Sequence, residues 1–284
     1  EKMAGVFKEV FASIILALFY PDASWLKELV DMDHMVDNNA INLAEVGADP
    51  EVVENNAVWP ITPAQRTDSG IPLATFDTKP THITNVEEME TSYNKAESVS
   101  RQHANTLYKK ACMSAAFNLA PAAHAVNTPV LATTGATNGT YKALTFKDIT
   151  DLSLAFDAGD LPQEGRILLL HPRHKADLKN EDIKLYKQMM ADGTIDGFKI
   201  YTFTGTPKYD AVTGAKNPYG SAVGNPSSVG IVTSEAMRAM GTIEGEPEKR
   251  WADYRGWLLG FQMRFVALPF RAYGYGAIYS AAIV

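Results

Sequence analysis

A long helix-forming stretch limits what this chain can fold into. Residues 85–120 contain neither proline nor glycine. Small or apolar residues recur there at steps of three and four, the spacing of one face of an α-helix. Thr84 and Glu87 have the spacing of a capping box, which predicts where the helix starts. The predicted face consists of Val86, Met89, Tyr93, Ala96, Val99, His103, Leu107, Ala111, Ser114 and Phe117. We expect one helix of about 50 Å, at 1.5 Å per residue.

Strand-like segments precede this helix. Residues 57–65 and 71–84 are rich in β-branched and aromatic residues, and the turn-forming residues 67–70 lie between them. This pattern predicts a long β-hairpin. Proline has no amide hydrogen to donate to a neighbouring strand, so prolines in both segments predict edge strands and a hairpin that projects outward. The prolines are Pro60, Pro63, Pro72 and Pro80.

The first 56 residues predict an arm. Apolar residues at helical spacing between residues 7 and 18 predict an amphipathic helix. Lys2 and Lys8 precede an apolar run at residues 11–20, which leaves a signal peptide as an alternative. Residues 25–56 mix short apolar groups with acids and show no sustained period. A segment without a core of its own is expected to lie across another surface.

The second half of the chain predicts an α/β unit. Residues 121–141 are rich in Ala, Thr, Gly and Pro and form a boundary before it. Hydrophobic patterns then predict helices and strands in alternation. The predicted elements are a helix at 145–156, a strand at 166–171, a helix at 172–190, a strand at 198–203, a Gly/Pro-rich loop at 204–228, a strand at 229–233, a short helix at 234–240, and one or two strands at 264–283.

Composition argues against several classes of function. With 46% apolar and 21% charged residues, the chain matches a globular protein and not a disordered one. A net charge of −7 argues against a protein that holds nucleic acid by neutralising phosphates. No apolar run reaches the roughly 18 residues needed to cross a membrane. The single cysteine, Cys112, allows no internal disulfide and fits a reducing compartment.

Motifs for catalysis or metal binding are incomplete. The glycines that precede Lys142 lack the spacing of a phosphate-binding loop. Ser221 lies one position too early for the nucleophile elbow of hydrolases. His171 and His174 could bind a metal, but no cysteine or carboxylate cluster completes the site, so a strand end with a helix cap is the preferred interpretation. We expect no catalytic, cofactor-binding or metal-binding residues and no enzyme activity.

Three further features have a structural interpretation. Lys109 and Lys110 could lower the pKa of the Cys112 thiol, but a small buried cysteine is more typical of this position in a helix. Residues 138–140 match a glycosylation sequon, and a hairpin turn is preferred. Aromatic residues near the C-terminus could line a ligand pocket, and a place in the core or an interface is preferred. They are Trp251, Tyr254, Trp257, Phe261 and Phe265.

The order of elements resembles the major capsid proteins of tailed bacteriophages, which share the Hong Kong 97-type fold. Residues 36–53, 75–81 (Thr-Phe-Asp-Thr-Lys-Pro-Thr) and 92–103 (Ser-Tyr-Asn-Lys-Ala-Glu-Ser-Val-Ser-Arg-Gln-His) are similar to capsid proteins of phages that infect Bacteroidetes. Asn94 departs from the Ser-Tyr-Asp-Lys phrase of those proteins. Residues 165–172 and 193–201 are similar to the central domain of the same fold.

This resemblance implies an α+β fold with five parts. The parts are an N-terminal arm at 1–56, an extended β-hairpin loop at 57–84, a spine helix and peripheral domain at 85–125, an axial domain at 126–240, and a return to the peripheral and axial sheets at 241–284. In such a fold the extended loop lies over a neighbouring subunit. Arg66, Asp68 and Lys79 are the candidates for contacts at its rim, each weak if exposed.

The function that the resemblance implies is structural. Such a protein assembles as hexamers and pentamers into the icosahedral shell of a virion, which encloses double-stranded DNA without sequence-specific binding. Portal and head-decoration or scaffolding proteins are further expected partners, assembly in the host cytoplasm is expected, and no membrane or cofactor is implied. Two alternatives remain open, an encapsulin-like nanocompartment shell protein and a soluble α/β enzyme.

Overall fold

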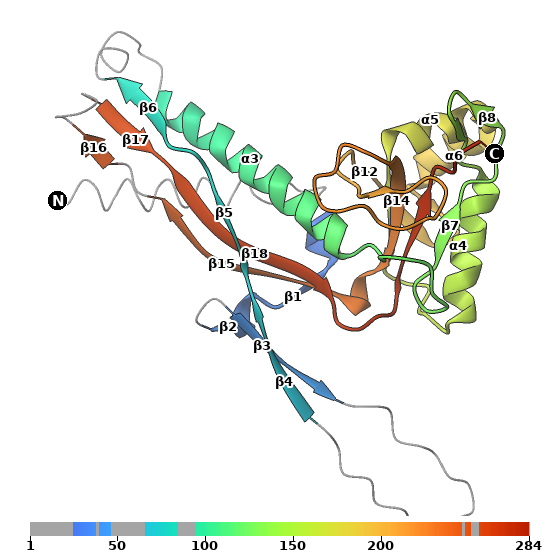
Figure 1. Cartoon of the computed structure of the whole chain (residues 1–284), viewed down its shortest axis with the longest axis horizontal. Helices are drawn as coiled ribbons and strands as arrows, with labels where there is room; N and C mark the ends of the chain where they lie inside the picture. The colour runs from blue at the N-terminus through green and yellow to red at the C-terminus, as the bar shows by residue number, and fades with distance from the viewer. Residues whose placement is uncertain are drawn as a thin grey trace, which may run out of the picture.

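The computed structural model describes residues 25–37, 40–46, 66–84, 95–245, 248–250 and 256–283. These residues form a mixed α+β fold. Figure 1 shows an elongated part built along one helix, an α/β unit at its end, and a two-stranded ribbon that projects away from both. The helices of the described residues are α3 (Lys95–Asn118), α4 (Phe146–Ala158), α5 (Pro172–Glu181) and α6 (Ile183–Asp192). None of them is long and apolar enough to cross a membrane.

In the elongated part, α3 packs on a four-stranded sheet. The strand order is β1 (Val30–Asp31), β15 (Ala236–Gly245), β18 (Phe261–Pro269) and β5 (Ala74–Asp77). Side chains of Phe261, Met263 and Phe265 alternate with less buried residues along β18 and contribute to one apolar core with α3. A second, three-stranded sheet orders β16 (Glu248–Arg250), β17 (Gly256–Leu259) and β6 (Thr81–Thr84).

The predicted long helix is confirmed over the 24 residues of α3, a length of about 36 Å. Val99, His103, Leu107 and Ala111 of the predicted face are buried. Residues 85–94, where the helix was expected to start, lie outside the described residues.

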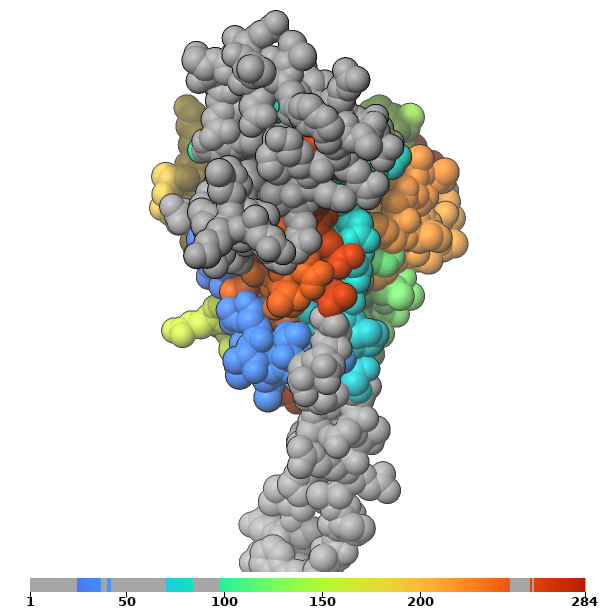
Figure 2. All heavy atoms as spheres, turned by 90° about the vertical axis from the view of Figure 1, so that its left-hand side faces the viewer, coloured from blue at the N-terminus to red at the C-terminus, as the bar shows by residue number. Residues whose placement is uncertain are grey.

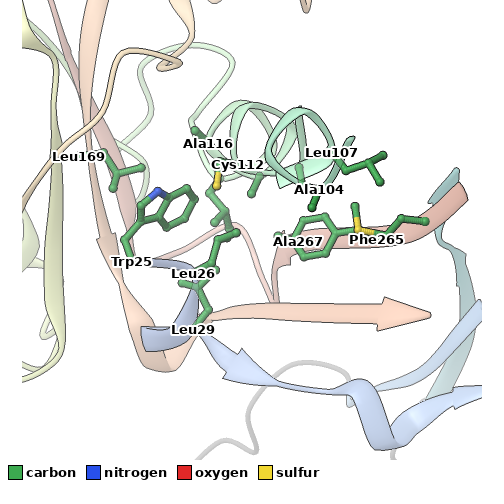
Figure 3. Close-up of a cluster of buried hydrophobic side chains, with 14 of the residues drawn as sticks. Trp25, Leu26, Leu29, Ala104, Leu107, Cys112, Ala116, Leu169, Phe265 and Ala267 are labelled. Atoms are coloured by element: carbon green, nitrogen blue, oxygen red, sulfur yellow. The ribbon is translucent and has the colours of Figure 1, made fainter. Parts of the chain in front are cut away.

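The prediction that residues 25–56 lack a core of their own and lie across another surface is confirmed at their start. Trp25, Leu26 and Leu29 are at most 4% exposed and join the core of α3 and β18. Figure 3 shows these three residues beside Leu169 of the α/β unit and Cys112 of α3. These side chains are few and irregularly spaced, so they create no periodic pattern in the sequence. The segment therefore links the two parts of the molecule.

The α/β unit contains a larger sheet. Strand β10 lies at its centre with every residue buried, parallel to β12 and antiparallel to β14. The order is β11 (Thr194–Ile195), β12 (Phe198–Thr202), β10 (Arg166–Leu170), β14 (Asn225–Val232), β19 (Tyr275–Tyr279) and β7 (Val130–Ala132), and β13 (Lys208–Tyr209) pairs with β14. Helix α4 packs closely on the sheet at Gly230, which has no side chain. A Cβ at this position would come within 2.9 Å of Leu152 Cδ2.

The predicted strands at 166–171, 198–203 and 229–233 are confirmed by β10, β12 and β14, and the strands at 264–283 by β18 and β19. The helix at 145–156 is confirmed by α4, which Thr145 and Asp148 start with a capping box. The helix at 172–190 is divided into α5 and α6. Asp182 lies at the division, where its carboxylate accepts hydrogen bonds from the amides of Lys184 and Leu185 and so caps α6.

The short helix predicted at 234–240 is wrong. Residues 233–235 form a single 3₁₀ turn, and residues 236–245 form β15. Eight residues of β15 have partners in β18, so pairing with a strand distant in the sequence decides the conformation of this segment.

The predicted hairpin pairs differently from expectation. Strand β4 (Arg66–Pro72) pairs with β3 (Ala40–Val46), which in turn pairs with β2 (Val36–Asp37). Residues 67–70 are thus strand and not a turn, while residues 57–65 lie outside the described residues. The pair Ile41 and Ile71 fixes this register because both side chains pack with Leu73. Among the described strands, β4, β5 and β6 each lie at a sheet edge, as predicted; Pro72 ends β4, and Pro80 lies between β5 and β6.

Candidate assembly surfaces

The two histidines with metal-site potential have structural roles. Burial lowers the pKa of His174 to about 3, and its ring nitrogens lie 2.7 Å from Ser228 Oγ and 2.8 Å from Ser280 Oγ. His171 Nδ1 accepts a hydrogen bond from the amide of Arg173, which confirms the predicted helix cap. Within the described residues, no group of three His, Cys, Asp or Glu side chains could hold a metal ion.

The other residues with chemical potential are also part of the scaffold. Burial raises the pKa of the Cys112 thiol to about 12, which confirms the buried interpretation. Asn138 starts the predicted hairpin turn between β8 (Thr137–Asn138) and β9 (Tyr141–Lys142), and its amide donates to Asp177 Oδ1. Ser221 lies in a turn, where its hydroxyl donates to the carbonyl oxygen of Val223.

The structure describes the side chains of two of the five C-terminal aromatic residues. Phe261 and Phe265 are at most 4% exposed and belong to the core, as predicted. Trp257 lies on β17, while Trp251 and Tyr254 lie outside the described residues. Phe261 and Phe265 therefore support the core interpretation.

The first candidate assembly surface is the ribbon of β3 and β4. In Figure 1 it extends away from the rest of the fold. Seven residues of each strand are paired, from Ala40 with Pro72 to Val46 with Arg66. Within the described residues, the sheet that contains the ribbon has only β2 as its further strand. A two-stranded ribbon is marginally stable alone, and its edges present free backbone groups to another chain.

The base of the ribbon is fixed by charged residues. Arg238 of β15 donates to Asp31 Oδ2 at 2.8 Å, and its other terminal nitrogen lies 3.9 Å from Asp33 Oδ2. Asp33 Oδ1 also accepts a hydrogen bond of 2.6 Å from the amide of Met240. Burial raises the pKa of Asp33. The segment that leads into β2 and β3 is therefore held against the central sheet.

The structure separates the three residues predicted to make contacts at the rim. Arg66 and Asp68 lie on β4, opposite Val46 and Ala44 of β3. Lys79 lies on the link between β5 and β6, away from the ribbon, and its side chain is exposed. The ribbon thus carries two of the three candidates.

A second candidate surface is an open cleft between β5 and α3. The cleft has a volume of about 520 Å³, and Lys79 and Lys110 line its two sides. His103 also lines the cleft, its Nε2 lies 3.0 Å from Thr81 Oγ1, and burial lowers its pKa. Sequence reasoning missed this cleft because its two walls are residues 75–81 and 102–110, whose proximity no local pattern reveals.

Comparison with known proteins identifies the fold. No family model matches the sequence, and no curated protein matches it. The capsid of cyanophage P-SCSP1u is 17% identical, with a TM-score of 0.66 over 93% of this chain and 90% of that chain. The capsid of Ralstonia phage GP4 is 9% identical, with a TM-score of 0.63 over 90% and 88%. A virus-like particle from Pyrococcus furiosus is 11% identical, with a TM-score of 0.58 over 96% and 99%. The chain therefore has the α+β fold of these shell proteins.

Proposed function

We propose that this chain is the major capsid protein of a tailed bacteriophage. In this role it is a structural protein without enzyme activity that assembles into the icosahedral shell around double-stranded DNA. The observation that carries the proposal is the extent of the likeness to phage capsids, which includes nine tenths of the chain or more.

The ribbon supports the same proposal. A projecting pair of strands has edges whose backbone groups can pair with another chain, so it gains stability when a neighbouring subunit covers it. The net charge of −7 is compatible with this role, because a shell encloses DNA without having to neutralise its phosphates. The alternative function, a soluble α/β enzyme, does not explain why this ribbon projects from the fold.

The finer parts of the proposal concern partners and origin. Hexamers and pentamers, a portal, and head-decoration or scaffolding proteins are the proposed partners, and the virion, assembled in the bacterial host, is the proposed location. The proposed origin in a Bacteroidetes-infecting phage rests on residues 36–53, 75–81 and 92–103. The solved capsids reported above come from other phages, a cyanophage and a Ralstonia phage.

The proposed division of the chain keeps a spine helix and peripheral domain at 85–125, an axial domain at 126–240 and a return at 241–284. We extend the proposed loop region to include β3, because β3 is the partner of β4. The ribbon and the residues that connect its strands then form the part that reaches a neighbour.

The proposal is tested by electron microscopy and light scattering of the purified chain. The expected result is closed shells or their hexameric and pentameric building blocks. A compact monomer that persists at high concentration and across salt concentrations would contradict it. Particles isolated from the natural source separate the encapsulin-like alternative, since a phage head contains DNA and joins a tail, whereas a nanocompartment contains protein cargo.

A further inference from the structure

Apolar side chains are exposed on the helices of the α/β unit. Leu154 of α4 is 64% exposed, and Ile183 and Leu185 of α6 are 51% and 48% exposed. A surface helix of a globular protein normally turns such residues toward the core. An exposed apolar cluster of this kind marks an interaction site. We name the surface made by Leu154, Leu185, Thr150, Asp192 and Asp196 the helix face.

The helix face is hollowed and acidic. Two hollows of about 320 Å³ each adjoin at Thr150 and Asp196, and one is lined by Leu154 and the other by Leu185. Asp192 and Asp196 contribute carboxylates to the lining. The two hollows together form a groove whose lining includes apolar side chains and carboxylates.

The basic residue in the lining, Arg166, does not offset this charge. It is 2% exposed and donates to Asp157 Oδ1 and to the carbonyl oxygens of Leu161 and Pro162. Its guanidinium is therefore already engaged within the α/β unit. The groove is suited to a partner that brings apolar side chains and a positive charge.

A second apolar surface lies on the loop between β12 and β14. Val212 and Val223 are 78% and 77% exposed. We name the surface made by Val212, Val223 and Lys208 the loop face. The Lys208 ammonium donates to the carbonyl oxygen of Ala222, which places a positive charge beside Val223.

The loop face is held in shape by its own hydrogen bonds. The carboxylate of Asp210 accepts from the amides of Val212 and Thr213, at 3.0 and 2.7 Å. The side-chain amide of Asn217 donates to the carbonyl oxygen of Val223 at 3.0 Å. An exposed apolar side chain on a braced loop loses little conformational entropy when it binds, so the loop face is preorganised for contact.

The two faces lie on opposite sides of the molecule. In Figure 2, the loop between β12 and β14 (orange) forms one edge of the view, and α4 to α6 (yellow-green to yellow) form the opposite edge. When two different surfaces on opposite sides bind each other, copies join head to tail, and such a contact closes into a ring if the rotation per copy allows it.

We propose that the loop face of one copy docks on the helix face of a second copy. The proposal rests on the proposed shell function, which requires rings of subunits. Val212 and Val223 supply the apolar side chains for the hollows beside Leu154 and Leu185. Lys208 supplies the positive charge that Asp192 and Asp196 complement. The partner of each surface is therefore another copy of this chain.

Cysteine cross-linking tests the pairing. Val223→Cys and Leu154→Cys are made as separate variants, mixed, assembled, and treated with a short bismaleimide. Cys112 is 1% exposed and does not react, so a product reports on the new thiols. The expected product is a covalent dimer in the mixture and not in either variant alone. Val223→Cys mixed with Met35→Cys, an exposed residue outside both faces, is the matched control and should give no dimer.

Charge substitution tests the direction of the contact. Val223→Asp brings a carboxylate to the acidic groove, and Leu154→Asp adds a carboxylate within it. For each variant alone we expect the association constant of this contact to fall at least about tenfold, which is about 1.4 kcal/mol. A mixture of the two retains one intact contact per pair, because the loop face of the Leu154→Asp copy meets the helix face of the Val223→Asp copy. The expected species is a heterodimer that does not grow.

The outcomes separate this inference from the proposed function. Wild-type chain that never assembles contradicts the shell proposal itself. Wild-type assemblies, together with variants that remain folded by circular dichroism and assemble normally, overturn the docking proposal alone, as does equal cross-linking in the Met35→Cys control.

Discussion

The side-chain nitrogen of Lys216 donates a hydrogen bond of 2.6 Å to the carbonyl oxygen of Ala120, just beyond the last residue of α3. The same nitrogen donates to the carbonyl oxygen of Phe117 at 3.0 Å and lies 4.4 Å from the centre of the Phe117 ring. Carbonyl oxygens at the end of a helix have no partner within it and carry partial negative charge. Lys216 therefore fixes the loop between β12 and β14 to the end of the long helix.

Replacing Lys216 with methionine keeps the length of the side chain and removes the charge. Because the carbonyl oxygens lose their donor, we expect the free energy of unfolding to fall by about 1 to 2 kcal/mol. Urea denaturation followed by circular dichroism measures the change. Lys179→Met, at an exposed position of α5, is the control and should stay within about 0.5 kcal/mol of wild type. Equal effects of the two substitutions would refute the role of Lys216.

The buried guanidinium of Arg166 gives a second prediction. It bonds to Asp157 at 2.6 Å and to two carbonyl oxygens, so Arg166→Met leaves buried acceptors without a donor. The expected loss of unfolding free energy is about 2 to 4 kcal/mol. The pair of Lys147 and Asp151 on α4, the helix that carries Asp157, is exposed, and Lys147→Met should cost less than about 1 kcal/mol. Comparison of the two variants in urea checks the difference.

Acid should destabilise the subunit through His174. The unfolded chain binds a proton at this residue near pH 6.5, whereas burial lowers the pKa in the fold to about 3. Between these values the unfolded state holds more protons, so stability is full above about pH 6.5 and falls as pH decreases, by up to about 1.4 kcal/mol per pH unit. The lowered pKa of His103 acts in the same direction.

The pH prediction is checked by urea denaturation at several pH values between 7 and 4 for wild type and His174→Gln. The variant should be less stable at pH 7, since the bonds to Ser228 and Ser280 change, and should lose less stability on acidification. Parallel pH curves for the two proteins would show that His174 does not carry the effect.

The sequence predicts those elements whose signals are local. The apolar spacing along α3, the run of β10, and the cap at His171 are all properties of neighbouring residues, and each matches the structure. The division of the helix at Asp182 was also open to detection, because aspartate is a strong N-cap residue.

Elements that depend on distant partners could not be predicted in this way. Residues 67–70 have turn-forming side chains, yet their pairing with residues 42–45 makes them a strand. The same holds for the assembly surfaces. Asp31 and Arg238 are separated by 207 positions, and the groove of the helix face combines residues from α4, α6 and the turn after β11. Only the fold brings these residues together.

The central claim is that the ribbon serves assembly and not the folding of the subunit. Asn42 and Gly70 are paired across β3 and β4, so residues 43–69 can be replaced by a short turn that joins them. This change keeps Ile41, Ile71 and Leu73, which anchor the ribbon in the core. Each halving of loop length lowers the closure cost by only about 0.6 kcal/mol, so this shortening should favour folding by at most roughly 2 kcal/mol and should not destabilise the subunit.

The most direct measurement compares thermal unfolding with particle yield for this shortened chain and for wild type. We expect the shortened chain to melt no lower than wild type and at most several degrees higher, the shift that roughly 2 kcal/mol produces. Light scattering and electron microscopy should show closed particles for wild type and none for the shortened chain. Shells formed in full yield without the ribbon, or a shortened subunit that no longer folds, would contradict the account.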